Sequence, residues 1–165
     1  MSSKITPSLV TAYSLSLNQS LGIKLLKDGI LQELFILASI PNVKSFTSFN
    51  EKLNLGLSLQ TKRIMTILMQ NKRLAMLPVL CQRLIGLLED CYGQKILIIE
   101  SSDIATAEQI YKNDISTKPL FIGYYVIYQT SNKQNVLKLR FDGKVLDYSL
   151  DNQIKLIKQK VMQGL

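Results

Sequence analysis

The spacing of apolar residues divides the chain into two parts. From Thr6 to about Cys91, apolar positions recur every three or four residues, which is the period of amphipathic helices. After Gly93 the spacing changes to strict alternation or to short continuous apolar runs, which are typical of β-strands. The pattern therefore predicts an α+β protein. An N-terminal all-α helical bundle is expected over residues 1–92, followed by a small α/β domain with a β-hairpin and a closing helix over residues 93–165.

Four long helices are predicted in the first part. The first begins after Thr6, a residue that can cap it, and has Pro7 in its first turn, where the missing N–H costs nothing. The second runs from about Ile23 to Ser39, and short helical turns are expected over 43–53. Ser58 caps the third. The fourth follows it directly. The positions expected to face inward are Leu9, Val10, Tyr13 and Leu17, then Leu26, Ile30, Leu34, Leu37 and Ala38, then Leu57, Ile64, Ile67 and Leu68, and finally Leu77, Cys81, Leu84 and Leu88.

The second part begins with a buried strand at 96–99 and continues with a short helix that a capping box from Thr106 to Gln109 would start. A β-branched and aromatic strand is predicted over 120–128, and an alternating strand over 136–141. Asp142-Gly143 is typical of a tight hairpin turn. The closing helix is expected to place its apolar residues on one side, namely Leu150, Ile154, Ile157 and Val161.

The composition argues against most enzymatic chemistry. The chain has no histidine, so histidine general bases, histidine-dependent triads and imidazole metal ligands are excluded. Cys81 and Cys91 show no metal-binding or redox spacing, and Cys81 falls on an apolar helical stripe, as a small buried hydrophobe would. The carboxylates are scattered, and no glycine-rich phosphate loop occurs. We expect no catalytic, cofactor-binding or metal-binding residues, although an enzyme that uses tyrosine, lysine or carboxylate chemistry stays open.

The net charge of +8 raises the alternative of a basic RNA-binding module. Residues before Gly93 carry ten basic and five acidic side chains, and the rest carry ten and seven, so neither part concentrates the charge. RNA binding would need the late lysines on one face, beside Tyr124, Tyr125 and Tyr128 as stacking platforms. These tyrosines lie in an apolar strand and are better explained as sheet and core residues. We therefore expect no nucleic acid partner, and another kind of protein-interaction module stays open as the second alternative. No apolar stretch is long enough for membrane insertion.

Three stretches carry motifs of a known family. Residues 65–78 contain a helix end at Asn71-Lys72-Arg73-Leu74, followed by a new helix at Leu77-Pro78. Residues 140–150 contain Lys144-Val145-Leu146-Asp147 and then Ser149, before the closing helix, and 11–17 is a weaker match. In their order and spacing these motifs resemble the F-type ATP synthase delta subunit family, which includes the oligomycin sensitivity-conferring protein (OSCP).

The sequence departs from the family pattern at several positions. Lys72 stands where the family usually has a glycine, and Asn135-Val136 stands where it usually has a glycine pair. Tyr148 also replaces a glycine, and the region 53–57 is short by comparison.

The resemblance implies a non-catalytic stator subunit in the F1 sector, which links the catalytic head to the peripheral stalk and resists rotor torque during proton-driven ATP synthesis. Its partners would be the N-terminal helices of the alpha subunits and a b-type stalk subunit, with one copy in a hetero-oligomer and no cofactor. It would sit peripherally on an energy-converting membrane, bacterial inner or mitochondrial inner, with the plastid thylakoid as a further alternative. The implied alpha-subunit groove consists of Tyr13, Leu17, Ile64, Ile67 and Leu68, and the implied stalk contact of Lys144, Asp147, Ile154 and Ile157.

Overall fold

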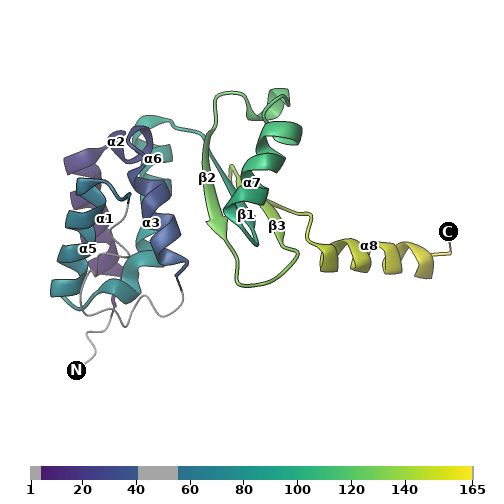
Figure 1. The fold of residues 1–165 in the computed structure, drawn as a ribbon, viewed down its shortest axis with the longest axis horizontal. Helices are drawn as coiled ribbons and strands as arrows, with labels where there is room; N and C mark the ends of the chain where they lie inside the picture. The colour runs from purple at the N-terminus through teal and green to yellow at the C-terminus, as the bar shows by residue number, and fades with distance from the viewer. Residues whose placement is uncertain (1–4, 41–55, 165) are drawn as a thin grey trace. The chain divides into compact units, whose positions relative to one another are not determined.

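The computed structural model describes residues 5–40 and 56–164. The chain forms two compact units, 1–94 and 95–165, whose border lies two residues after the predicted one (Figure 1). The first, here called the helical unit, contains only helices in its described part. The second, the sheet unit, contains a four-stranded mixed sheet and ends in a helix. The predicted α+β fold class is therefore confirmed, while the helical turns expected over 43–53 lie outside the described residues.

Helix α1 (Pro7–Leu21) begins as predicted, because the Thr6 hydroxyl accepts a hydrogen bond from the Leu9 N–H at 3.3 Å. Its buried face differs from the predicted one. Val10, Ser14 and Asn18 are buried, whereas the predicted Leu9, Tyr13 and Leu17 are only half-buried. The helix packs chiefly against α6 (Leu77–Tyr92). Small and polar side chains on its inner face therefore belong to the core, although apolar spacing alone would place them outside.

The helix predicted over 23–39 is broken in the structure. Helix α2 (Lys24–Lys27) ends at Asp28, and α3 (Ile30–Ala38) begins after Gly29, whose φ of 71° is in the left-handed region that favours glycine. The prediction of one continuous helix is wrong because it treated Gly29 as an ordinary helical position. The inward-facing residues were predicted correctly, since Leu26, Ile30, Leu34 and Leu37 are buried and Ala38 is half-buried.

Helix α5 (Leu59–Gln70) has the predicted cap, because the Ser58 hydroxyl accepts from the Thr61 N–H. It ends in a tight turn in which the Arg73 N–H donates to the Leu68 carbonyl at 2.7 Å and the Lys72 N–H to the Met69 carbonyl at 3.0 Å. These two bonds define a Schellman motif. A 3₁₀ turn, η2 (Leu74–Met76), then leads into α6. The predicted stripe of α6 is confirmed, since all four of its members are buried, namely Leu77, Cys81, Leu84 and Leu88.

A polar link joins α3 to the start of α5. The Glu33 carboxylate accepts hydrogen bonds from the Ser58 N–H at 3.0 Å and from the Ser58 hydroxyl at 2.7 Å. It also accepts from the hydroxyl of Thr61, a residue that is fully buried. The negative charge therefore lies at the N-terminus of α5, where free N–H groups and the helix dipole favour it.

The sheet has the strand order β2-β1-β3-β4, with β1 (Ile96–Ser101) parallel to β2 (Tyr125–Thr130) and the other pairs antiparallel. The buried strand predicted at 96–99 is confirmed within β1. The strand predicted from Leu120 begins only at Tyr125, because Pro119–Phe121 forms a 3₁₀ turn, η4, and Gly123 follows it at a φ of 85°.

Strands β3 (Leu137–Phe141) and β4 (Lys144–Asp147) form the predicted hairpin. Asp142 and Gly143 take φ values of 49° and 70°, as the turn residues of a two-residue hairpin do. The closing helix α8 (Leu150–Met162) follows, as predicted.

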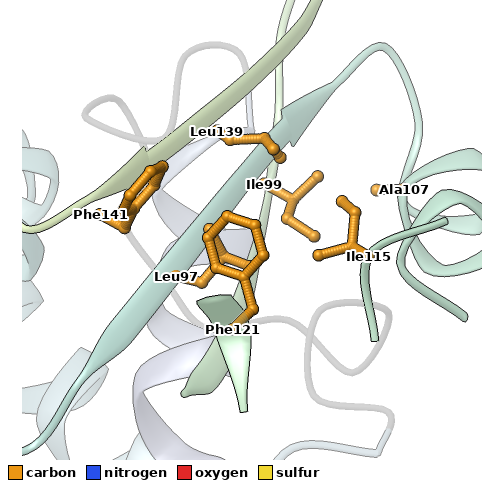
Figure 2. Close-up of a cluster of buried hydrophobic side chains, with 7 residues drawn as sticks. All are labelled: Leu97, Ile99, Ala107, Ile115, Phe121, Leu139 and Phe141. Carbon is orange, nitrogen blue, oxygen red and sulfur yellow. The ribbon is translucent and has the colours of Figure 1, made fainter. Parts of the chain in front are cut away.

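The core of the sheet unit lies between the sheet and α7 (Ile104–Ile110), which contacts β1 and β2 and continues into the π-helical turn η3 (Tyr111–Ile115). Figure 2 shows side chains from β1, β3, α7, η3 and η4 in this cluster. Its buried members are Leu97, Ile99, Ala107, Ile115, Phe121, Leu139 and Phe141. The predicted cap of α7 is wrong. Asp103 starts the helix by accepting from the Thr106 N–H at 2.7 Å, so Thr106 already lies within the first turn.

Candidate partner-binding surfaces

The five residues implied as an alpha-subunit groove fall into two groups. Tyr13 and Leu17 on α1 are half-buried, and Ile67 on α5 is 49% exposed, so these three present apolar surface. Ile64 and Leu68 are only 6% and 1% exposed. This corrects the expectation that all five line an open groove. Ile64 and Leu68 are four residues apart and share the inner face of α5, while Ile67 is turned about 60° away from Ile64.

Tyr13 is held against the C-terminal end of α5. The Asn71 amide donates to the Tyr13 hydroxyl at 3.2 Å and to the Ile67 carbonyl at 3.0 Å. The Arg73 guanidinium lies 5.9 Å from the centre of the Tyr13 ring, which is within the range of a cation–π contact. These contacts place Tyr13 beside the last turn of α5, which also contains Ile67. We call Tyr13, Leu17 and Ile67 the α1/α5 surface.

A second concave surface of the helical unit was not predicted. It is an apolar pocket of about 700 Å³ between the start of α1 and the first half of α6. Its lining residues are Ile5, Thr6, Pro7, Val10, Thr11, Val79, Gln82 and Arg83. We call this the α1/α6 pocket. Val79 is the residue in the sequence that could have indicated this pocket, because it is apolar but lies outside the buried stripe of α6. It is 55% exposed in the structure.

The apolar side of α8 is uncovered in the structure. The helix has no buried residue, and Ile154 and Ile157, two of the residues implied for the stalk contact, are 41% and 61% exposed. Leu150, Ile154, Ile157 and Val161 follow one another at steps of four, three and four residues, which is the spacing of a coiled-coil seam. We call these four the α8 seam.

The other two residues implied for the stalk contact differ in role. Lys144 is exposed, at the start of β4. Asp147 accepts a hydrogen bond from the Ser149 N–H at 2.9 Å, and the Asn152 amide donates to the Asp147 backbone carbonyl at 2.8 Å. The hydrogen bonds from Ser149 hold the pKa of the Asp147 carboxyl below its usual range. Asp147 therefore fixes the junction between β4 and α8, while Lys144 is available to a partner.

A smaller apolar pocket, of about 300 Å³, lies beside β3 and β4 on the sheet unit. Leu137, Leu139 and Leu146 contribute from the strands, and Phe121 and Ile115 from the turns η4 and η3. Its rim includes Leu120 and Tyr148, which are 60% and 49% exposed. Exposed apolar side chains thus lie beside the strand that leads into the α8 seam.

The tyrosines considered as base-stacking platforms take part in the fold. The Tyr124 hydroxyl donates to the Asp142 carboxylate at 2.6 Å, and its ring packs edge-on against Phe121 and Phe141. Tyr128 packs on the same core, and burial, followed by the nearby Glu108 charge, raises its phenol pKa. Two of the three rings therefore already pack within the protein, which weakens the RNA-binding alternative.

Other polar groups of the described residues have clear partners or are buried. Arg140 and Glu100 make an ion pair of 2.8 Å across β3 and β1. Cys81 is buried as predicted, and burial raises the pKa of its thiol far above the usual range. Within 5–40 and 56–164, no three histidine, cysteine or acidic side chains gather as metal ligands would. In the same ranges, none of the helices combines the length and apolar character that a bilayer crossing requires.

No protein-family model matches the chain, and a search of curated proteins finds no match either. The family therefore stays a resemblance based on the motifs.

Proposed function

We propose that this protein is a non-catalytic stator subunit of an F-type ATP synthase, of the delta subunit or OSCP type. It would join the catalytic head to the peripheral stalk and resist the torque of the rotor. The helical unit would bind alpha-subunit N-terminal helices, and the sheet unit would bind the b-type stalk subunit.

One observation carries the proposal. Among the described residues, Lys72, Asn135 and Asp142 are the non-glycine residues with positive φ. Lys72, at 54°, stands where the resembled family usually has a glycine, and Asn135, at 57°, stands at the first position of its usual glycine pair. Glycine adopts this region without steric cost, whereas other residues do so at a cost. The chain thus keeps a glycine-type backbone at two places where its residues differ from the family pattern.

The α1/α5 surface gives the head contact a physical basis. An amphipathic helix binds by inserting apolar side chains between helices, and half-buried apolar residues with fixed positions supply such a site. The Tyr13 hydroxyl already accepts a hydrogen bond from Asn71, so the Tyr13 side chain would lose little freedom on binding.

The α8 seam supports a stalk contact at the other unit. A seam with coiled-coil spacing is stable in water when a second helix covers it. Lys158 and Lys160 flank the seam, and two copies of α8 would bring these like charges together. A different helix with acidic flanking positions fits better than self-association.

The test is calorimetric titration of the full chain with a synthetic peptide that copies the N-terminal helix of the alpha subunit from the same organism. We expect binding, and a loss of at least tenfold in affinity when Tyr13→Asp or Ile67→Asp places a charge in the α1/α5 surface. Leu15→Asp is the matched control. Leu15 is 42% exposed and lies on the opposite side of α1 from Tyr13, two residues or about 200° away.

The outcome decides between the stator and an unrelated interaction protein. If the wild-type chain does not bind the peptide, the stator proposal fails. If Tyr13→Asp and Ile67→Asp bind the peptide as tightly as the wild type and the Leu15→Asp control do, the α1/α5 surface is not the binding site. The stalk contact is tested separately, by titrating the wild type and Ile157→Asp with the b-type stalk subunit from the same organism.

A further inference from the structure

The α1/α6 pocket has the chemistry of a binding site. None of its residues belongs to the α1/α5 surface. Val10 forms its apolar floor at 5% exposure, and Ile5 and Val79 contribute exposed apolar surface at 39% and 55%. Concave, mostly apolar surfaces with a few polar groups are typical of ligand sites, and apolar grooves also accept amphipathic helices.

Two polar side chains of the pocket have no polar partner among residues 5–40 and 56–164. The hydroxyl groups of Thr6 and Thr11 already make hydrogen bonds, to Ser8 and to the Pro7 carbonyl. By contrast, the side chains of Gln82 and Arg83 make no hydrogen bond or ion pair with another residue of the described part of the chain. Both side chains carry hydrogen-bond donors, and the Arg83 guanidinium can donate two hydrogen bonds to one carboxylate.

The surrounding charge favours an anionic group. Helix α1 contains no charged residue, and the acidic residues of α6 are Glu89 and Asp90. Glu89 is six residues from Arg83, which corresponds to about 9 Å along the helix. Of the residues that line the pocket in the described part of the chain, Arg83 is the charged one. The pocket therefore carries a positive charge, which attracts an anionic group.

We propose that the α1/α6 pocket binds an amphipathic helical segment of a partner protein, with apolar side chains against Val10 and Val79 and a carboxylate on Arg83. Val79 and Arg83 are four residues apart, so they lie on the same face of α6. An acidic residue one turn from an apolar residue on the partner helix would match this spacing. The site is distinct from the α1/α5 surface, because the two share no residue and the pocket is completed by α6 and not by α5. It does not depend on the stator assignment.

The test selects peptides that bind the chain, so the identity of the partner protein need not be known. A library of random 16-residue peptides is displayed and selected on the immobilised full chain, and the enriched peptides are synthesised and titrated. We expect them to contain an acidic residue three or four positions from an apolar one. Their affinity should fall about tenfold for Arg83→Met, which keeps the apolar stem and removes the charge. Val79→Asp should weaken binding further. Arg63→Met, at an exposed arginine of α5, is the matched control and should change nothing.

The outcomes separate the proposal from its rivals. Absence of enriched peptides, or peptides that bind Arg83→Met and Val79→Asp as well as the wild type, would overturn it. Peptides that lose affinity for Tyr13→Asp alone would assign binding to the α1/α5 surface and also refute it. Sodium dodecanoate is titrated as a separate probe. If it binds at Arg83 while no acidic peptide is enriched, the ligand is a lipid-like carboxylate and not a protein helix. Arg83 is exposed, so Arg83→Met should fold even if Val79→Asp does not.

Discussion

Replacing Lys72 by glycine should stabilise the helical unit. Lys72 occupies the left-handed position of the Schellman turn after α5, with a φ of 54°. A side chain in this region costs about 1–2 kcal/mol. Glycine would remove that cost but would add about 0.4–1 kcal/mol of chain entropy to the unfolded state. The net gain in the free energy of unfolding should be about 0.5–1 kcal/mol.

The assay compares Lys72→Gly with Lys72→Ala in the full chain. Alanine removes the lysine side chain and its contacts but keeps the Cβ atom, so Lys72→Ala isolates the side-chain contribution. Urea unfolding followed by helical ellipticity gives the free energy. Hydrogen exchange of the buried α6 amides, such as that of Leu84, ascribes the change to the helical unit. Lys72→Gly should be more stable than Lys72→Ala by about 1 kcal/mol.

Gly93 provides the inverse experiment in the same unit. It ends α6 at a φ of 61°, and a Cβ atom there would meet no atom within 4 Å apart from its chain neighbours. Gly93→Ala should therefore destabilise by about 1 kcal/mol through backbone conformation alone. Equal stability of Lys72→Gly and Lys72→Ala would refute the reasoning, because the positive φ would then carry no cost.

Three further predictions concern polar and thiol groups. Glu33→Ala should destabilise the helical unit by about 1–3 kcal/mol in urea unfolding, because it removes three hydrogen bonds at the start of α5, whereas the exposed Asp90→Asn should have little effect. In the native protein, a thiol reagent at pH 8 should modify the exposed Cys91 and leave the buried Cys81 unmodified, and denaturant should expose both. Because the pKa of Asp147 is lowered in the folded protein, its hydrogen bonds stabilise the fold at pH values above the pKa that Asp147 has in the unfolded chain. This stabilisation is lost as the pH falls through the pKa of the folded protein. An NMR titration of the carboxyl carbon should place that pKa below the ordinary aspartate range.

Hydrophobic spacing predicted the units and most of the elements, because each element buries one face and periodicity reports that face directly. The inner face of α1 was missed because two of its buried residues are polar. Ser14 and Asn18 are buried, and no periodicity of apolar residues can mark them. Two element boundaries differ from the predicted ones at glycines with positive φ. Gly29 divides the helix predicted over 23–39, and the strand predicted from Leu120 begins only after Gly123, although the side-chain pattern continues through both positions.

The candidate surfaces were harder to predict than the fold. Apolar spacing cannot tell whether a stripe is covered by the same chain or left for a partner. Ile64 and Ile67 lie one turn apart on α5, and the first is buried while the second is 49% exposed. The α1/α6 pocket depends on residues brought together from the ends of two helices about seventy positions apart, so only the structure could assemble it.

The exposure of the α8 seam has an energetic consequence. Its members Leu150, Ile154, Ile157 and Val161 are between 41% and 68% exposed, and each apolar side chain fully buried contributes about 1.5–3 kcal/mol. The start of α8 is attached to the sheet unit, because the Leu137 N–H donates to the Ser149 hydroxyl and the Leu150 N–H donates to the Asn135 carbonyl. A helix that is anchored at its start and uncovered along its apolar side gains stability chiefly when another surface covers it. The seam is therefore better explained as half of an interface than as part of the core of the sheet unit.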